Sequence, residues 1–249
     1  MTQKVVLSTG CSSGIGLALA ARITKDEKKR FMVYATMRNL SKGEALVEAA
    51  GQTLGGTLEI KQLYVCDDDS IKACVDSLPE RRVDILISNA GMGLIGPIEC
   101  QSIDEMKTVI DTNFFGLRHG HSGDFIQRRL HSVQVCTGRL LRKQALRFNL
   151  NISLIEPGPV ITEFERKVYE EGMKTDLSKA DKVTADMFTN IYLKNYNQIF
   201  ESLGQTAEDV AEHTLKIITM ENPPLPLNFL KLPCWRSRKS FTLEKDKSN

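Results

Sequence analysis

Residues 5–16 place a short apolar run, which we interpret as a strand, directly before a turn that contains three glycines. A helical pattern of apolar residues begins at Leu17, immediately after the turn. Gly10 permits a tight turn, Gly14 lets the backbone approach a phosphate, and Gly16 lets helix and strand pack closely. The N-terminus of the helix adds free N–H groups and a positive dipole end. This order predicts a turn that holds a dinucleotide pyrophosphate; the alternative is a turn with a purely structural role.

Strand patterns and helical patterns alternate along the first half of the chain. We expect strands at residues 5–8, 31–36, 58–65 and 83–88, with helices beginning at residues 17, 42, 70 and 103. Repeated strand–helix units predict the α/β class and a doubly wound parallel sheet, the Rossmann fold. Such sheets bind ligands at the carboxyl ends of the strands. At 249 residues the chain suits one dinucleotide-binding domain over residues 1–226, followed by a disordered, basic tail at 227–249.

Charge and cysteine content exclude several classes of function. The chain has 33 basic and 31 acidic residues, which indicates no nucleic-acid partner. No apolar run reaches the roughly 20 residues that span a bilayer, and no secretory signal is visible. The six cysteines show no paired spacing, so we expect free thiols in a cytoplasmic (cytosolic) protein. Trp235, among basic residues of the tail, leaves weak association with an anionic membrane surface as an alternative.

The T-G-x-x-x-G-I-G form of the turn resembles the short-chain dehydrogenase/reductase family. Within that family, residues 9–20 are similar to the photoreceptor retinol dehydrogenases and the type 1 17β-hydroxysteroid dehydrogenases. Four more segments agree, at residues 34–38, 89–94, 111–116 and 154–160. The resemblance covers residues 3–116 and about 143–225. It implies an oxidoreductase that moves a hydride between a nicotinamide cofactor and a hydroxyl or carbonyl of an apolar substrate, a retinoid or a 17β-hydroxysteroid.

The end of the second strand predicts which dinucleotide is bound. An acidic residue after this strand usually holds the ribose 2′-hydroxyl of NAD. This chain has Arg38 there, and no acid lies between Thr36 and Leu40. A guanidinium suits a 2′-phosphate through bidentate, charge-assisted hydrogen bonds, and the Ser12 hydroxyl offers a further one. We therefore predict NADP(H) in preference to NAD(H), with a solvated surface arginine as the alternative.

One position of the cofactor pattern departs from the family. Relatives carry an acid that contacts adenine after the third strand, where this chain has Tyr64. Asp67 follows three positions later, and we expect it to replace that acid with an altered direction. The resemblance places the remaining cofactor contacts on matching positions. The complete predicted set is Thr9, Gly10, Ser12, Ser13, Gly14, Ile15, Gly16, Arg38, Asp67, Asn89, Ala90, Gly91, Pro157, Gly158, Val160 and Thr162.

The residues that carry catalysis in this family are missing from the chain. By resemblance, the family uses a Ser and a Tyr-x-x-x-Lys pair, with an Asn that supports a proton relay. A free tyrosine titrates near pH 10, so a lysine one helical turn away must lower its pKa. None of the five tyrosines has a lysine four positions later, and only Tyr34 has any cation there, Arg38. Asn113 stands at its expected place, in a supporting catalytic role only.

Residues 117–142 break the family pattern. Only 44 positions separate Asn113 from Pro157, and in relatives this interval is longer and holds the fifth strand, the catalytic Ser and the Tyr/Lys helix. Residues 117–142 also lack sustained apolar periodicity. We interpret them as out-of-frame or mis-spliced translation, with a divergent insert as the alternative. His119 and His121 have no third metal ligand nearby, so we predict no metal site.

This loss has consequences for the sheet and for function. We expect the sheet to be disrupted near its fifth strand: either residues 133–137 fill the gap as an improvised strand, or the fourth strand pairs directly with a strand at 151–155. The family's dimer helices lie largely in the missing stretch, which puts a homodimer in doubt. Catalysis is expected to be crippled. Three alternatives remain: an enzyme with a substitute acid, an NADP-binding or partner-binding module, and a gene product that does not fold stably.

The region after the last predicted strand belongs to the substrate. Residues 163–198 are predicted to be helical, where relatives build a lid over a bulky apolar substrate. Several apolar side chains suit either that pocket or the core of the protein. They are Met92, Leu94, Ile95, Phe164, Met187 and Phe188.

Overall fold

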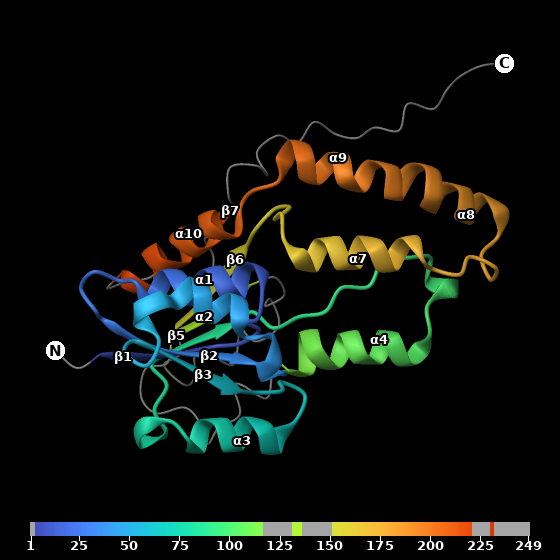
Figure 1. Cartoon of the computed structure of the whole chain (residues 1–249). Coiled ribbons are helices and arrows are strands. Elements are labelled where there is room, and N and C mark those ends of the chain that lie inside the picture. Colours follow the sequence, from blue (N-terminus) through green and yellow to red (C-terminus); the bar gives the residue numbers. More distant parts are fainter. Residues whose placement is uncertain (1–2, 117–130, 136–150, 221–229, 232–249) are drawn as a thin grey trace.

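A computed structural model describes residues 3–116, 131–135, 151–220 and 230–231, and it contains one parallel sheet of seven strands (Figure 1). The strand order is β3-β2-β1-β4-β5-β6-β7. The switch between β1 and β4 defines the doubly wound arrangement, so the predicted Rossmann fold is confirmed. The strands are β1 Lys4–Ser8, β2 Phe31–Met37, β3 Leu58–Gln62, β4 Ile85–Ser88, β5 His131–Val135, β6 Asn151–Glu156 and β7 Leu230–Lys231.

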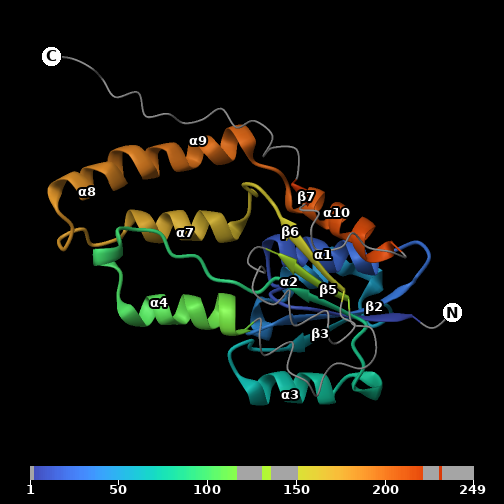
Figure 2. The ribbon, with the colours of Figure 1, turned by 180° about the vertical axis from the view of Figure 1, so that it is seen from behind.

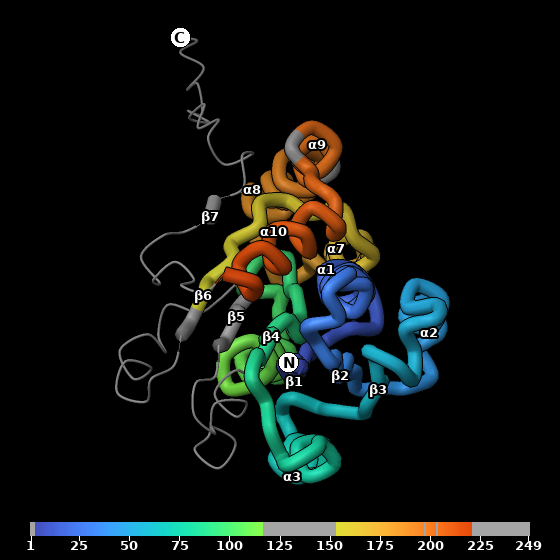
Figure 3. The backbone as a smooth tube through the Cα atoms, turned by 90° about the vertical axis from the view of Figure 1, so that its left-hand side faces the viewer, coloured from blue at the N-terminus to red at the C-terminus, as the bar shows by residue number. Residues whose placement is uncertain are grey.

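Helices cover both faces of the sheet. Figures 1 and 3 show α1 (Gly14–Thr24), α2 (Glu44–Ala50) and α10 (Ala207–Thr219) on one face, with α3 (Asp68–Asp76) and α4 (Ile103–Ile110) on the other. Capping boxes fix two of the starts, since the side chains of Ser102 and Glu105 begin α4 and those of Thr206 and Asp209 begin α10. Shorter 3-10 turns lie at Leu40–Lys42, Gly51–Thr53, Pro79–Arg81 and Ile98–Cys100.

The alternation of side chains along β1 builds two cores. Val6 is fully buried in the core that α1, α2 and α10 share. Val5 and Leu7 point to the opposite face, where they join a second core that includes Ile71 of α3. Because successive side chains of a strand point to opposite faces, an apolar run without polar interruptions is what a strand buried on both faces needs.

β5 fills the place where we expected the sheet to be disrupted. It pairs in parallel with β4, where Ile87 lies opposite Val133, and with β6, where Val133 lies opposite Ser153. Of the two alternatives, the structure has the improvised strand, displaced from residues 133–137 to His131–Val135. The sheet is therefore continuous from β3 to β7, because a parallel ladder uses backbone groups that nearly every residue supplies.

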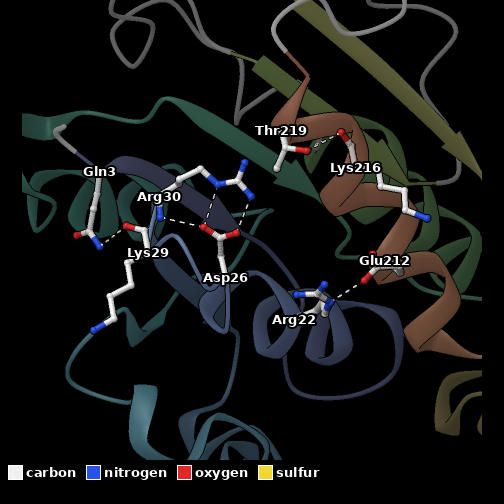
Figure 4. A network of polar contacts seen from close by, with 8 residues as sticks. All are labelled: Gln3, Arg22, Asp26, Lys29, Arg30, Glu212, Lys216 and Thr219. Atoms are coloured by element: carbon white, nitrogen blue, oxygen red, sulfur yellow. Dashed lines mark hydrogen bonds and ion pairs between the residues drawn. The ribbon is translucent and has the colours of Figure 1, made fainter.

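Polar contacts at the far end of the sheet tie the first helix to its surroundings (Figure 4). Arg30 binds the two carboxylate oxygens of Asp26 through Nη2 at 2.6 Å and Nε at 3.0 Å. These hydrogen bonds hold the pKa of Asp26 below its usual value. Arg22 of α1 donates from Nε to Glu212 of α10 at 2.7 Å, which joins two helices far apart in the sequence.

A helical lobe follows β6 and extends past the carboxyl ends of the strands. Figure 2 shows α7 (Glu163–Met173) running beside a second helical arm made of α8 (Lys182–Met187) and α9 (Lys194–Leu203). A π-helical stretch at Phe188–Leu193 joins α8 to α9, and another at Asp111–Phe115 continues α4. The predicted helical region at 163–198 is therefore two arms with a turn between them.

Several predictions fall on residues outside the described ranges. These include most of 117–142, with His119 and His121, and all of the 227–249 tail except Leu230–Lys231. Those two residues form β7 beside β6, because the edge of β6 offers unpaired backbone groups. Within the described ranges, no helix combines the length and the apolar character needed to cross a bilayer.

Candidate functional site

A cavity of about 560 Å³ lies at the carboxyl ends of the strands and beneath the helical lobe. Its walls come from the glycine turn, the ends of β2 and β3, the loop after β4, the π-helical end of α4, and the loop from β6 into α7. The lining residues are Gly10, Ser12, Ser13, Gly14, Ile15, Met37, Arg38, Leu63, Tyr64, Val65, Asn89, Ala90, Gly91, Met92, Gly93, Thr112, Asn113, Pro157, Gly158, Val160, Thr162, Phe164, Glu165 and Lys167.

The glycine turn fits a phosphate group. Gly10 and Gly14 have φ values of +70° and +58°, a region that disfavours residues with a Cβ. A Cβ on Gly16 would lie 2.2 Å from the carbonyl oxygen of Gly10, so the helix approaches the turn as closely as glycine allows. α1 begins after Ser13 with no acidic residue in its first turn and no capping bond from the Ser13 side chain. The first residues of α1, Gly14 and Ile15, line the cavity. No acidic side chain neutralises the positive dipole end of this helix, as an anion site requires.

A threonine joins the glycine turn to the loop after β4. The Thr9 hydroxyl oxygen accepts hydrogen bonds from the backbone N–H groups of Asn89 and Ala90, each at 3.0 Å. In return, Asn89 donates from Nδ2 to the carbonyl oxygens of Thr9 and Gly10, both at 3.1 Å. Thr9 itself is buried. These bonds make the two loops a single floor for the cavity.

Asn113 fixes the neighbouring part of the wall. Its Oδ1 accepts from the Met92 N–H at 2.8 Å, and its Nδ2 donates to the Met92 carbonyl oxygen at 2.7 Å. Asn113 lies in the π-helical stretch after α4, and a Cβ on Gly91 would contact its Oδ1 at 3.3 Å. Both ends of the amide are thus used to hold the loop after β4, which is the role that the described contacts give to this residue.

Arg38 and Tyr64 form one end of the cavity. The Arg38 guanidinium carbon lies 5.8 Å from the centre of the Tyr64 ring, within the range of a cation–π contact. Arg38 is otherwise exposed, and its carbonyl oxygen accepts a hydrogen bond from Gln62 Nε2 at 3.1 Å. A hydrogen bond with Cys66 is the main cause that raises the pKa of Tyr64. The phenol is therefore protonated at neutral pH, and this end of the cavity is aromatic and cationic.

Asp67 lies outside the cavity lining, contrary to its expected role near adenine. Its Oδ1 accepts hydrogen bonds from the backbone N–H groups of Asp69 at 3.0 Å and Ser70 at 3.3 Å. These bonds make Asp67 the N-cap of α3. The prediction missed this because it started the helix at residue 70. A run of three acids before Ser70 and an apolar helical pattern is itself a signal for an N-cap.

One side of the cavity is formed by α7. Thr162 caps this helix by accepting from the Glu165 N–H at 3.3 Å, and Phe164, Glu165 and Lys167 line the cavity. The Glu165 carboxylate accepts a hydrogen bond from the hydroxyl of Tyr196 in α9. Burial and this bond raise the pKa of Tyr196 above its usual value. The pair ties the two arms of the lobe together at the cavity.

Of the apolar residues predicted for the substrate pocket, Met92 and Phe164 line the cavity, whereas Leu94, Ile95, Met187 and Phe188 do not. Ile95 instead packs on Gly172 of α7, where an added Cβ would lie 2.6 Å from its Cδ1.

Most of the predicted cofactor set is brought together. All predicted residues except Thr9, Gly16 and Asp67 line the cavity. Thr9 and Gly16 contact lining residues from outside the cavity, and Asp67 caps α3. Sequence reasoning did not assign Met37, Thr112, Glu165 or Lys167 to the site, and it treated Tyr64 only as a departure from the family. The described residues contain no group of three or more His, Cys, Asp or Glu that could hold a metal ion.

Fold and site together define a Rossmann-type α/β protein with a ligand cavity at the switch point of its sheet. A family model described as short chain dehydrogenase matches residues 4–122. Retinol dehydrogenase 8 of Bos taurus is 39% identical over 249 residues, which covers 89% of this chain and 80% of the relative. The 17-beta-hydroxysteroid dehydrogenase type 1 of Homo sapiens is 35% identical over 255 residues, covering 90% and 77% of the two chains. The chain belongs to the short-chain dehydrogenase/reductase family.

Solved structures agree at the level of the fold. The closed form of a serine dehydrogenase complexed with NADP+ superposes with a TM-score of 0.67 at 23% identity, covering 92% of this chain and 94% of that one. The resemblance stated from the glycine turn is confirmed, together with its kinship to retinol and 17β-hydroxysteroid dehydrogenases.

Proposed function

We propose that this chain binds NADP(H) in the cavity at the ends of the strands. The observation that carries the proposal is Arg38, an exposed guanidinium in the cavity lining after β2. A ribose 2′-phosphate accepts two hydrogen bonds from such a fork, whereas a 2′-hydroxyl gains little from it. The N-terminus of α1 and the turn at Gly10 and Gly14 are suited to the pyrophosphate.

The family chemistry defines the substrate class that we propose. Bound nicotinamide supplies or accepts the hydride, and the second substrate is a retinoid or a 17β-hydroxysteroid, as the names of the relatives suggest. Met92 and Phe164 give the cavity an apolar surface on the side of α7. Thr162, which matches the family position that touches the nicotinamide carboxamide, lies in the same wall.

We further propose that turnover is strongly reduced. Reduction of a carbonyl needs a proton at its oxygen as the hydride arrives, and in this family a tyrosine tuned by a lysine supplies it. No tyrosine of the sequence is followed by a lysine at the required spacing. Asn113 cannot transfer that proton, and its amide is already engaged by Met92. Loss of a general acid alone lowers the rate by about 10²–10⁴-fold.

A calorimetric titration of the full chain tests the cofactor proposal. We expect NADPH to bind at least about tenfold tighter than NADH, because hydrogen bonds to charged groups are worth about 1.5–3 kcal/mol. Arg38→Asp should remove this preference, and Lys28→Asp, which makes the same charge change on an exposed lysine outside the cavity lining, should leave it. Equal loss of NADPH and NADH affinity in Arg38→Asp would contradict the assignment.

Turnover is measured separately, as NADPH oxidation with all-trans-retinal or estrone. We expect cofactor binding with a turnover below about 0.1 s⁻¹, because loss of the general acid lowers a typical rate of about 10 s⁻¹ by at least about 10²-fold. A rate in the ordinary range for enzymes, about 1 s⁻¹ or faster, would show that a substitute acid operates and would refute the proposed loss of activity.

A further inference from the structure

The described residues that line the cavity near Arg38 and Tyr64 include no carboxylate. Among the described lining residues the one acid is Glu165, which lies on α7 beyond β6, whereas β3 is at the opposite end of the strand order. Asp67 directs its Oδ1 to the first N–H groups of α3. Within the described lining, an exocyclic amino group therefore finds no carboxylate at the end of the cavity that holds Arg38.

The main chain of Tyr64 is also occupied. Its N–H donates to the Ser70 hydroxyl at 2.9 Å, and its carbonyl oxygen accepts from the Asp67 N–H at 3.1 Å. The Tyr64 side chain is half-buried and lines the cavity between Leu63 and Val65. The ring is thus what this residue presents to a ligand.

The positions of Arg38 and Tyr64 suit the two parts of an adenosine 2′-phosphate, the guanidinium for the phosphate and the ring for the base. Their cation–π contact of 5.8 Å keeps the guanidinium beside the ring, so that a phosphate and a planar base can be bound at adjacent points. Stacking on an aromatic ring is tolerant of base identity, because every base has a π-face. A carboxylate, in contrast, selects a base with an amino group and repels one with a carbonyl oxygen there.

We propose that Tyr64 recognises the base of NADP(H) through the face of its ring, and that the site therefore accepts a cofactor whose base lacks the exocyclic amino group. This inference rests on the proposed binding of NADP(H). It makes Tyr64 a specificity-determining residue, and it makes the cofactor site permissive toward hypoxanthine in place of adenine.

The test compares binding of NADPH with binding of its hypoxanthine analogue, reduced deamino-NADP, to the full chain by calorimetry. In the unaltered protein we expect the two dissociation constants to agree within about threefold, since the π-face is retained. In Tyr64→Asp we expect adenine to be preferred by about tenfold or more, because a hydrogen bond to a charged acceptor becomes available to its amino group. The ratio of the two dissociation constants within each variant removes effects that are common to both ligands, such as a new ion pair between the introduced aspartate and Arg38.

Two further variants separate the ring from its hydroxyl. Tyr64→Phe should bind both cofactors as the unaltered protein does, whereas Tyr64→Leu should weaken both by about tenfold. Tyr192→Leu is the matched control, because Tyr192 is 46% exposed and stacks on Phe188 outside the cavity lining. Thermal unfolding of each ligand-free variant checks that it is folded.

The outcomes distinguish this inference from the proposed function. Tenfold discrimination against the hypoxanthine cofactor by the unaltered protein would overturn the inference alone. Full NADPH affinity in folded Tyr64→Leu would also overturn it. No measurable binding of NADPH by the unaltered protein would refute the proposed function, and the inference with it.

Discussion

Replacing Gly16 with alanine tests whether the glycine turn is built for close packing. The added Cβ would lie 2.2 Å from the Gly10 carbonyl oxygen and 2.4 Å from Asn89 Nδ2, well inside van der Waals contact. The neighbours must move, and overpacking of this kind costs about 1–3 kcal/mol. Asn89 would also lose its 3.1 Å bonds to Thr9 and Gly10, at about 1–3 kcal/mol for buried groups left unpaired.

Alanine also has an advantage in a helix, worth about 1 kcal/mol over glycine. These contributions combine to a loss of about 1–5 kcal/mol, so we expect Gly16→Ala to lower the free energy of unfolding by about 3 kcal/mol. For a chain of this size that corresponds to a fall of about 6–12 °C in Tm. Urea denaturation followed by circular dichroism measures the loss, and titration with NADPH should show weaker binding because the floor of the cavity has shifted.

Gly56→Ala is the matched control. Gly56 is exposed, and the nearest atom to an added Cβ there is the Thr53 carbonyl oxygen at 3.5 Å, an ordinary contact. We expect a change within about 1 kcal/mol of the unaltered protein. If the two alanine variants unfolded at the same urea concentration, the packing argument for the turn would be refuted.

Three further results are expected from other parts of the molecule. Asp26→Asn should lower the free energy of unfolding at pH 7, and this loss of stability should shrink as pH falls below about 4, because the ion pair with Arg30 holds the pKa of Asp26 below its usual value and stabilises only the charged carboxylate. A loss of stability that urea denaturation finds to be independent of pH would count against the ion pair between Asp26 and Arg30. Cys11 is fully buried, with burial raising its pKa to about 11, so mass spectrometry should find it unmodified by iodoacetamide in the folded protein and modified in urea. Asn113→Ala should lower stability by about 1–3 kcal/mol, since it leaves the N–H and carbonyl groups of Met92 without their partner, and an unchanged denaturation midpoint would contradict this.

Local patterns predicted the part of the site that is local. The strand, turn and helix around Gly10 follow each other within a few residues, and their order alone defines the phosphate-binding geometry. The positions of Arg38 and Asn89 follow from the rule that parallel strands end at one edge of the sheet. The structure places all of these residues around one cavity.

The parts that sequence reasoning missed depend on boundaries or on tertiary contacts. β3 was expected to reach residue 65 but ends at Gln62, because the Tyr64 N–H bonds to the Ser70 hydroxyl and leaves the ladder. Because β3 ends earlier than expected, Tyr64 lies in the loop that lines the cavity and Asp67 caps α3. Glu165 and Lys167 come into the site through the direction in which α7 leaves β6, which no periodicity encodes.

The shared hydroxyl of Thr9 has a consequence for how this cavity can change over evolutionary time. The loop after β4 donates two backbone hydrogen bonds to one side-chain oxygen about 80 positions earlier in the sequence, so a substitution that moves the backbone of either loop breaks a bond between the two. Variants that widen the floor for a new cofactor would therefore have to arise in pairs. New specificity is easier to acquire at the rim, where Arg38 and Tyr64 can be exchanged singly without disturbing either loop.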